Sequence, residues 1–267
     1  MLKSLAALLS LPLAAVLALA LPSSLPSHLA IPSAHDSAIL ARRILHLSKT
    51  GTLSTVFPPA RDDDAVSPDA AVAGTPIGLL DYFADCDPAD SGNPTILAIE
   101  IATSFRNVRA GSNISLAVQW VPPYPPDKRI SLWSRLSGFL FNTAPSDTPD
   151  TAPYSAANLP RFSLIGYIDR VDNDAVPHLE HDALAECFVA KHPDARYWLP
   201  GNSIHRSEWV KLVVTHVYWV GGFGDRAYIG WLPLELYNSV SRDQWEAVRL
   251  PGEEPGWKEW SIIDGEL

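Results

Sequence analysis

HVYWVGGFGDRAYIGWL, residues 216–232, consists of an aromatic run, a glycine-rich turn and a second aromatic run. The first run ends a longer segment, SEWVKLVVTHVYWV at 207–220, whose β-branched and aromatic residues are typical of a strand. Gly221, Gly222 and Gly224 lack a Cβ, so their backbone can pass close to a neighbouring strand or to a planar ring. The pattern predicts a β-hairpin that either only closes a β-barrel or also holds a flat, aromatic cofactor.

The rest of the chain alternates between apolar segments and turns rich in glycine, proline and asparagine. The apolar runs predict strands at 51–57, 77–86, 95–104, 114–121 and 161–171. Helical spacing of apolar residues predicts one helix within 36–51, with Asp36 as its N-cap, and a second within 175–193. This order of elements favours a β-barrel or sandwich with flanking helices, in the α+β class.

Residues 1–20 have the layout of a secretory signal peptide, with Lys3 before an apolar run and a cleavage signature at Ala18 and Ala20. A membrane anchor is the alternative, but the run is short and leads into a Pro/Ser-rich leader, residues 21–35. We expect cleavage near Ala20 and a protein that is secreted or sent to a vacuole or lysosome. No later segment is apolar for long enough to span a membrane.

Cleavage would remove one charged side chain, that of Lys3, so the net charge of −10 would become −11. An acidic chain without a Lys/Arg cluster lacks the electrostatic footprint that binds nucleic acid. It also lacks the polybasic patch that binds anionic lipid. The expected partner is a small molecule, a glycan or another protein.

Two segments depart from the barrel pattern. Residues 122–160 open with PPYPP and close with a second proline-rich run, which excludes regular strands and helices and predicts a long insertion. Residues 241–267 form an acidic, tryptophan-bearing C-terminal tail whose packing no pattern predicts.

Cys86 and Cys187 are the two cysteines of the chain. The secretory pathway permits a disulfide between them. However, Cys187 falls on the apparent core face of a predicted helix, with Leu184 and Phe188, and this favours two buried thiols. Asn113 begins the sequon Asn-Ile-Ser at a turn ahead of an apolar run, and we expect it to be glycosylated.

The segments LARRILHLSKTGTLSTV (40–56) and ILAIEIATSFRNVRAGSNISLAV (96–118) resemble parts of the pyridoxamine-phosphate-oxidase-like superfamily, the flavin-binding split barrels. The first segment is similar to the opening helix and first strand of that superfamily, and the second is similar to a later strand, an asparagine-containing turn and the next strand. FVAKHPDARYWLPG (188–201), followed by EWVKLVVTHVYWVGGFG (208–224), is similar to the end of the CREG family of secreted glycoproteins.

The resemblance implies that residues 36–240, apart from the insertion, form a six-stranded split β-barrel of the FMN-binding type. Such barrels are usually homodimers with two flavin sites at the subunit interface. CREG members keep the barrel and the dimer but have largely lost the flavin pocket, whereas bacterial relatives with a GGFGRA-like element bind flavin or haem. The residues GGFGDRA at 221–227 lie between these two branches.

A flavin phosphate requires positive charge together with hydroxyl or amide donors. The candidates in this chain are Thr103, Ser104, Arg106, Asn107 and Lys211. The second strand offers only Gly78 and Leu79 where flavin-binding relatives supply some of these groups, which counts against FMN. The ordinary interpretation is that the candidates are polar residues of a turn and of strand ends.

The candidates for stacking on a flavin or porphyrin ring are Tyr218, Trp219, Phe223, Tyr228 and Trp231, and Gly222 is a candidate for close backbone approach to that ring. His216 or His205 is a candidate for ligating haem iron. The alternative is that the aromatic residues of the hairpin fill the barrel end and the dimer interface. We favour this alternative, because aromatic stripes belong to cores more often than to cofactor sites.

Other chemistry has no motif here: the chain contains no G-x-S-x-G, P-loop or H-E-x-x-H. His178, His181 and Asp182 lack further ligands at metal-binding spacing, so no metal site is expected. The sequence favours a dimeric, secreted CREG-like protein that binds a partner or ligand without redox turnover, and it identifies no catalytic residue. The alternatives are an FMN-dependent oxidoreductase of the pyridoxamine-phosphate-oxidase type, in which the flavin does the chemistry, and a haem-binding or haem-degrading protein.

Overall fold

The computed structural model describes residues 31–59, 70–126, 155–171, 178–224 and 227–257, without the side chains of 178–182. The expected signal peptide and most of the proline-rich insertion lie outside the described residues. Within them, no helix is both long and apolar enough to cross a membrane.

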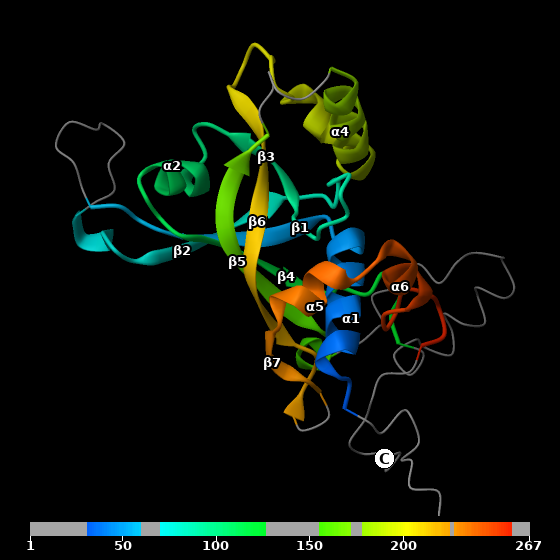
Figure 1. Ribbon diagram of the computed structural model, residues 1–267. Coiled ribbons are helices and arrows are strands. Elements are labelled where there is room, and N and C mark those ends of the chain that lie inside the picture. The colour runs from blue at the N-terminus through cyan, green and yellow to red at the C-terminus, as the bar shows by residue number, and fades with distance from the viewer. Residues whose placement is uncertain (1–30, 60–69, 127–154, 172–177, 225–226, 258–267) are drawn as a thin grey trace, which may run out of the picture. The chain divides into compact units, whose positions relative to one another are not determined.

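Seven strands form one antiparallel sheet (Figure 1). They are β1 (Thr50–Val56), β2 (Pro76–Tyr82), β3 (Thr95–Ile99), β4 (Ile114–Gln119), β5 (Arg161–Arg170), β6 (Ser207–Val220) and β7 (Ile229–Leu232). The order is β2-β1-β4-β5-β6-β3, and β7 pairs with β6. The described parts of the edge strands meet at a single bridge, between Ala84 and Thr95, so the barrel is split rather than closed. This confirms the predicted split barrel, with β7 as a short addition to its six strands.

One row of apolar side chains crosses the sheet on its inner face. Successive strands place these residues directly opposite one another: Leu232, Val217, Leu164, Leu116, Leu53 and Leu79. All except Leu79, at the edge, are buried. Because side chains alternate between the faces of a strand, a slip of one residue would move this row into solvent. Burial of the row therefore fixes the register of the sheet.

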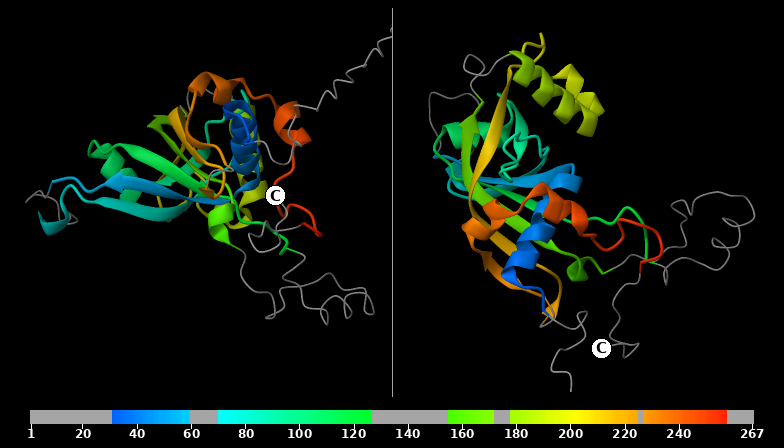
Figure 2. Two further views of the ribbon diagram at one scale, coloured as in Figure 1. Left: turned by 90° about the horizontal axis from the view of Figure 1, so that it is seen from below. Right: turned by 45° about the vertical axis from the view of Figure 1, so that its right-hand side comes forward.

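The α-helices of the described residues that flank the sheet are α1 (Ala34–Leu47), α2 (Thr103–Arg109), α4 (His178–Lys191), α5 (Leu234–Ser239) and α6 (Arg242–Ala247). Helix α1 begins one residue after Ser33 rather than after the predicted cap Asp36. The Ser33 side chain accepts from the Asp36 N–H while the Asp36 carboxylate accepts from the Ser33 N–H, a capping box. Ala41, Ile44 and Leu45 of α1 are buried in the main core. Helices α5 and α6 lie against α1 (Figures 1 and 2).

Arg42 is fully buried on α1 and joins three parts of the chain. Its Nη2 donates to the backbone oxygen of Asp90 at 2.7 Å and to the Asp90 carboxylate at 2.5 Å, between β2 and β3. Its Nη1 donates to the backbone oxygen of Val240, just after α5, at 3.2 Å. The Tyr237 ring lies 5.6 Å from the guanidinium, and its hydroxyl donates to the Gly92 carbonyl at 2.9 Å. A Cβ at Gly92 would lie 2.7 Å from that ring, so this position requires glycine.

The described part of the C-terminal tail packs onto α1 and onto the start of the proline-rich insertion. Trp245 is buried in the main core. The indole N–H of Trp120 donates to the Pro251 carbonyl at 2.7 Å, and that of Trp257 donates to the Tyr124 carbonyl at 2.8 Å. The tail therefore belongs to the packed domain as far as residue 257.

Cys86 and Cys187 form a disulfide bond, which corrects the expectation of two buried thiols. Cys187 is exposed on α4, and Cys86 is half-buried in the segment after β2. Phe188 of α4 packs into a small second core with Ala84, and this contact leaves the two cysteine Cα atoms 6.0 Å apart. Helical periodicity could not show which distant segment covers this face of α4.

Removing the disulfide with the double change Cys86→Ala and Cys187→Ala should lower the free energy of unfolding by about 2–5 kcal/mol, because the bond closes a long loop in the unfolded chain. Urea denaturation of both proteins, with and without a reducing agent, measures this. Reduction should lower the midpoint of the wild type and leave that of the double variant unchanged. An equal response of the two proteins to reduction would contradict the assignment.

Candidate functional site

Four predicted phosphate ligands lie on helix α2, which packs against β1. Thr103 is the first residue of the helix and Arg106 is half-buried. Ser104 and Asn107 are buried, and the Asn107 Nδ2 donates to the Thr55 hydroxyl of β1 at 3.0 Å. Ser104 and Asn107 therefore face the interior of the domain, and the amide of Asn107 joins α2 to the barrel.

The remaining candidates lie along β6 and after it. Lys211 stands opposite Thr95 of β3 and Asp169 of β5. Trp219 follows eight residues later on the same extended strand, which corresponds to a separation of about 26 Å. The structure therefore does not bring Lys211 and Trp219 into one site.

The glycine-rich turn allows the aromatic residue before it to pack closely against the backbone of the turn. Trp219 is buried against Phe162, with ring centroids 6.0 Å apart. A Cβ at Gly221 would lie 2.8 Å from the Trp219 Nε1, and Gly222 is buried. Phe223 is 63% exposed, and the stacking candidates Tyr218 and Trp231 are exposed as well.

An aromatic patch, defined by His216, Tyr218, Ile229 and Trp231, lies on the exposed side of β6 and β7. The Trp231 ring is 5.1 Å from that of Tyr218 and 6.0 Å from that of His216, in edge-on contacts. Trp231 is 58% exposed, and the other three residues are also exposed. His205, the second haem-ligand candidate, is half-buried in the turn before β6.

The patch is one end of a second row of residues, which we call the outer row. Strand register places its members directly opposite one another: Trp231, Tyr218, Ser163, Ala117, Thr52 and Leu80. Its ends are bulky and apolar and its middle is small. Leu80 is 72% exposed. The outer row thus presents exposed, bulky residues at both ends and small residues between them that are half-buried or exposed.

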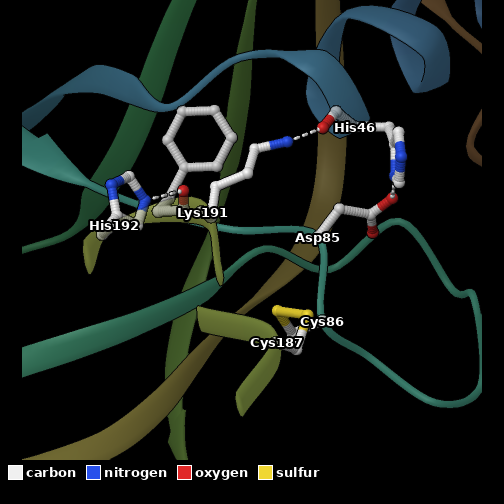
Figure 3. The surroundings of a disulfide bond; sticks show 7 residues. His46, Asp85, Cys86, Cys187, Lys191 and His192 are labelled. Atoms are coloured by element: carbon white, nitrogen blue, oxygen red, sulfur yellow. Dashed lines mark hydrogen bonds and ion pairs between the residues drawn. A yellow bond between two sulfur atoms is a disulfide. The ribbon is translucent and has the colours of Figure 1, made fainter. Parts of the chain in front are cut away.

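A polar junction joins α1, α4 and the segment after β2 beside the disulfide (Figure 3). The His46 Nδ1 lies 3.2 Å from the Asp85 carboxylate, and the Lys191 ammonium donates to the His46 carbonyl. The buried His192 donates from Nε2 to the Phe83 carbonyl at 2.9 Å. Burial lowers the pKa of Lys191 and that of His192, because each charged form loses solvation.

Metal ligands do not gather in the part of the chain that the structure describes: no three His, Cys, Asp or Glu side chains form a group there. The side chains of His178, His181 and Asp182 lie outside that part.

The fold and its two-sided sheet place this protein in the class of split β-barrels. A sequence model described as "CREG, beta-barrel" matches residues 32–239. The chain belongs to the CREG β-barrel family. A comparison with curated proteins finds no matching relative.

Solved structures with a similar fold include a haem-binding protein of Mycobacterium smegmatis, with a TM-score of 0.48 and 20% identity over 79% of this chain and 62% of that chain. A second is the haem storage protein HutZ of Vibrio cholerae, with a TM-score of 0.38 and 14% identity over 69% of this chain and 92% of that chain. A third is a putative pyridoxamine 5'-phosphate oxidase of Listeria innocua, with a TM-score of 0.35 and 9% identity over 71% of this chain and 100% of that chain. The match thus spans less than two thirds of the mycobacterial chain.

The sequence reasoning missed the polar junction and the role of Arg42. Arg42 had a detectable signal, because it follows Ala38 by four residues and precedes Leu45 by three, on the apolar face of a predicted helix. His46, Asp85 and Lys191 had no such signal, since three separate elements bring them together.

Acidification should destabilise the protein through His192. Its pKa in the folded state lies below the unfolded value of about 6.5. As the pH falls below that value, His192 binds a proton in the unfolded chain but remains neutral in the folded chain. The free energy of unfolding therefore falls by at most about 1.4 kcal/mol per pH unit. His192→Gln should flatten this dependence in denaturation curves between pH 7 and pH 5.

Protonation of Asp81 changes the stability of the folded protein in the opposite direction, and it does so equally in the wild type and in His192→Gln. Burial raises its pKa to about 6, so the folded chain binds the extra proton and gains stability as the pH falls through that value. Both proteins retain Asp81, and the difference between their pH profiles isolates His192. Parallel profiles would contradict the prediction.

Proposed function

We propose that this CREG-family protein is a secreted, dimeric binding protein that works without redox turnover. The observation that carries the proposal is the outer row, an uncovered face on the same strands that bury the core. Its exposed apolar side chains, Trp231, Tyr218 and Leu80, support a contact with a partner, because contiguous exposed apolar side chains often mark such contacts.

A second copy of the chain fits the outer row. In a two-fold arrangement, the bulky end of one row, Trp231 and Tyr218, faces the small middle of the other, Ala117 and Thr52. Six strands at a spacing of about 4.8 Å give the row a length of roughly 24 Å. Large aromatic side chains are enriched at the centres of such interfaces.

Strand β2 gives independent support for an interface. It is an edge strand with no Lys or Arg, and Leu79 and Leu80 are exposed on its two faces. Natural proteins usually protect a free apolar edge with charges, bulges or a cover. A partner subunit against this part of the sheet would provide that cover.

The contacts of the predicted cofactor residues support the proposal that the protein works without redox turnover. Asn107 is bonded to Thr55, and Trp219 is part of the core. Strands β1 and β2 carry no basic residue for a phosphate. The remaining phosphate candidates are divided between α2, which carries Thr103, the buried Ser104 and Arg106, and β6, which carries Lys211.

Entry into the secretory pathway rests on the N-terminal segment 1–20 and is compatible with the disulfide, since such bonds persist in oxidising compartments. Asn113 is exposed between α2 and β4, where a glycosyltransferase can reach it. The further partner remains a protein, a glycan or a small molecule.

Leu80→Asp should weaken the dimer by about tenfold or more, because it buries an unpaired carboxylate at the end of the outer row. Light scattering coupled to size exclusion, over a range of concentrations, measures the mass. Ile204→Asp is the matched control, because Ile204 is 71% exposed in the turn before β6. A monomeric wild type, or an equal effect of the two changes, would refute the dimer.

Addition of FMN or haemin to the purified protein should leave each absorbance spectrum unchanged and should not quench tryptophan fluorescence.

The second candidate function is haem binding on the aromatic patch, which the exposed His216 beside Trp231 favours. A stoichiometric shift of the haem band that is lost in His216→Ala would replace the proposal with that function. Stoichiometric flavin bands would replace it with the oxidoreductase.

A further inference from the structure

A cleft of about 480 Å³ opens where α1 ends and β1 begins. Its other walls come from the end of β4, from residues 120–123 and from the C-terminal tail. The volume lies within the range of about 300–1,000 Å³ that is typical of small-molecule sites. The cleft shares no residue with the outer row. Its tail residue, Glu253, lies beyond the segment that matches the family.

Two charged residues of the cleft neutralise each other. The Nε and Nη2 of Arg43 donate to the two carboxylate oxygens of Glu253, each at 2.8 Å. These bonds raise the pKa of Arg43, and both side chains are largely buried. Arg249 also lies 3.9 Å from the same carboxylate. The acceptors of Glu253 are therefore occupied, and this pair forms a rigid, nearly neutral wall.

Lys49 supplies the remaining charge of the cleft. Its side chain is exposed and forms no ion pair or hydrogen bond within the part of the chain that the structure describes. Burial is the main cause of the lowered pKa of Lys191 and of His192, and the charge of Lys49 adds a smaller effect in the same direction, so Lys49 lies near the polar junction. A bound anion would relieve this repulsion between Lys49 and Lys191. In a chain with a net charge of −10, the cleft is a local positive site.

The other lining residues divide into polar and apolar groups. Ser48, Thr50 and Gln119 supply hydroxyl and amide groups. Leu47, Trp120, Val121 and Pro123 supply an apolar surface. An anionic head group can pair with Lys49 and the neutral donors while an apolar body covers the rest. A single unpaired ammonium matches one negative charge, whereas a phosphate typically recruits several cations.

We infer that this cleft binds a small monocarboxylate with an apolar body. The carboxylate accepts from the Lys49 ammonium, and the body lies against Leu47 and Val121. The inference concerns a site other than the outer row and does not depend on the dimer.

Isothermal titration of the full mature protein with octanoate tests the assignment, with octanol and octylammonium as probes of the same length. Octanoate should bind at least about tenfold more tightly than either, because only its head group pairs with the ammonium. Lys49→Gln should remove that preference. Arg206→Gln, which removes an exposed cation elsewhere, should retain it.

Val121→Asp is the second variant, because Val121 is exposed at the cleft wall and tolerates a polar side chain. Its carboxylate should weaken octanoate binding. Equal affinity for the three probes, an unchanged preference in Lys49→Gln, or an equal loss in Arg206→Gln would overturn the inference. Each outcome is independent of the oligomeric state.

Discussion

The buried guanidinium of Arg42 is the interaction on which the arrangement of the domain depends. Helix α1, the turn before β3 and the chain after α5 are far apart in sequence, and all three donate or accept hydrogen bonds around it. A buried charge is costly unless it is paired and bonded. Arg42 is paired with the Asp90 carboxylate, donates to two backbone carbonyls and lies over the ring of Tyr237. All of these partners are present only when the three segments are in place. The same group therefore positions α1 over the core and brings the C-terminal tail to the cleft beside Lys49.

The two faces of the sheet differ in burial and in side-chain size. The inner row is apolar throughout, and its burial stabilises the barrel and fixes its register. The outer row alternates with it residue by residue and is left free to be large at its ends and small in its middle. Packing of the core thus constrains the side chains of one face much more than those of the other.

The elements with a strong local pattern were predicted well. The prediction for β6 matches its bounds, Ser207–Val220, because β-branched and aromatic residues run without interruption between polar turns. The N-cap of α1 was misplaced by three residues, since Ser33 and Asp36 both suit a cap and only their mutual bonding decides between them. The strand expected at 95–104 ends at Ile99, because Thr103 begins α2 instead. The phosphate candidates looked available in the sequence, but nothing local shows that Asn107 turns inward to Thr55.

The local patterns of the sequence indicated a barrel or sandwich with flanking helices, because periodicity and turn chemistry are local properties. The resemblance of several segments to known families narrowed this to the split barrel. The tertiary structure alone decided which distant residues meet. It paired Cys86 with Cys187, placed Trp245 in the core and set the exposed Lys49 at the wall of a cleft. These contacts join segments that are separated by many residues, and no local pattern encodes how the packing of helices on the sheet brings such segments together.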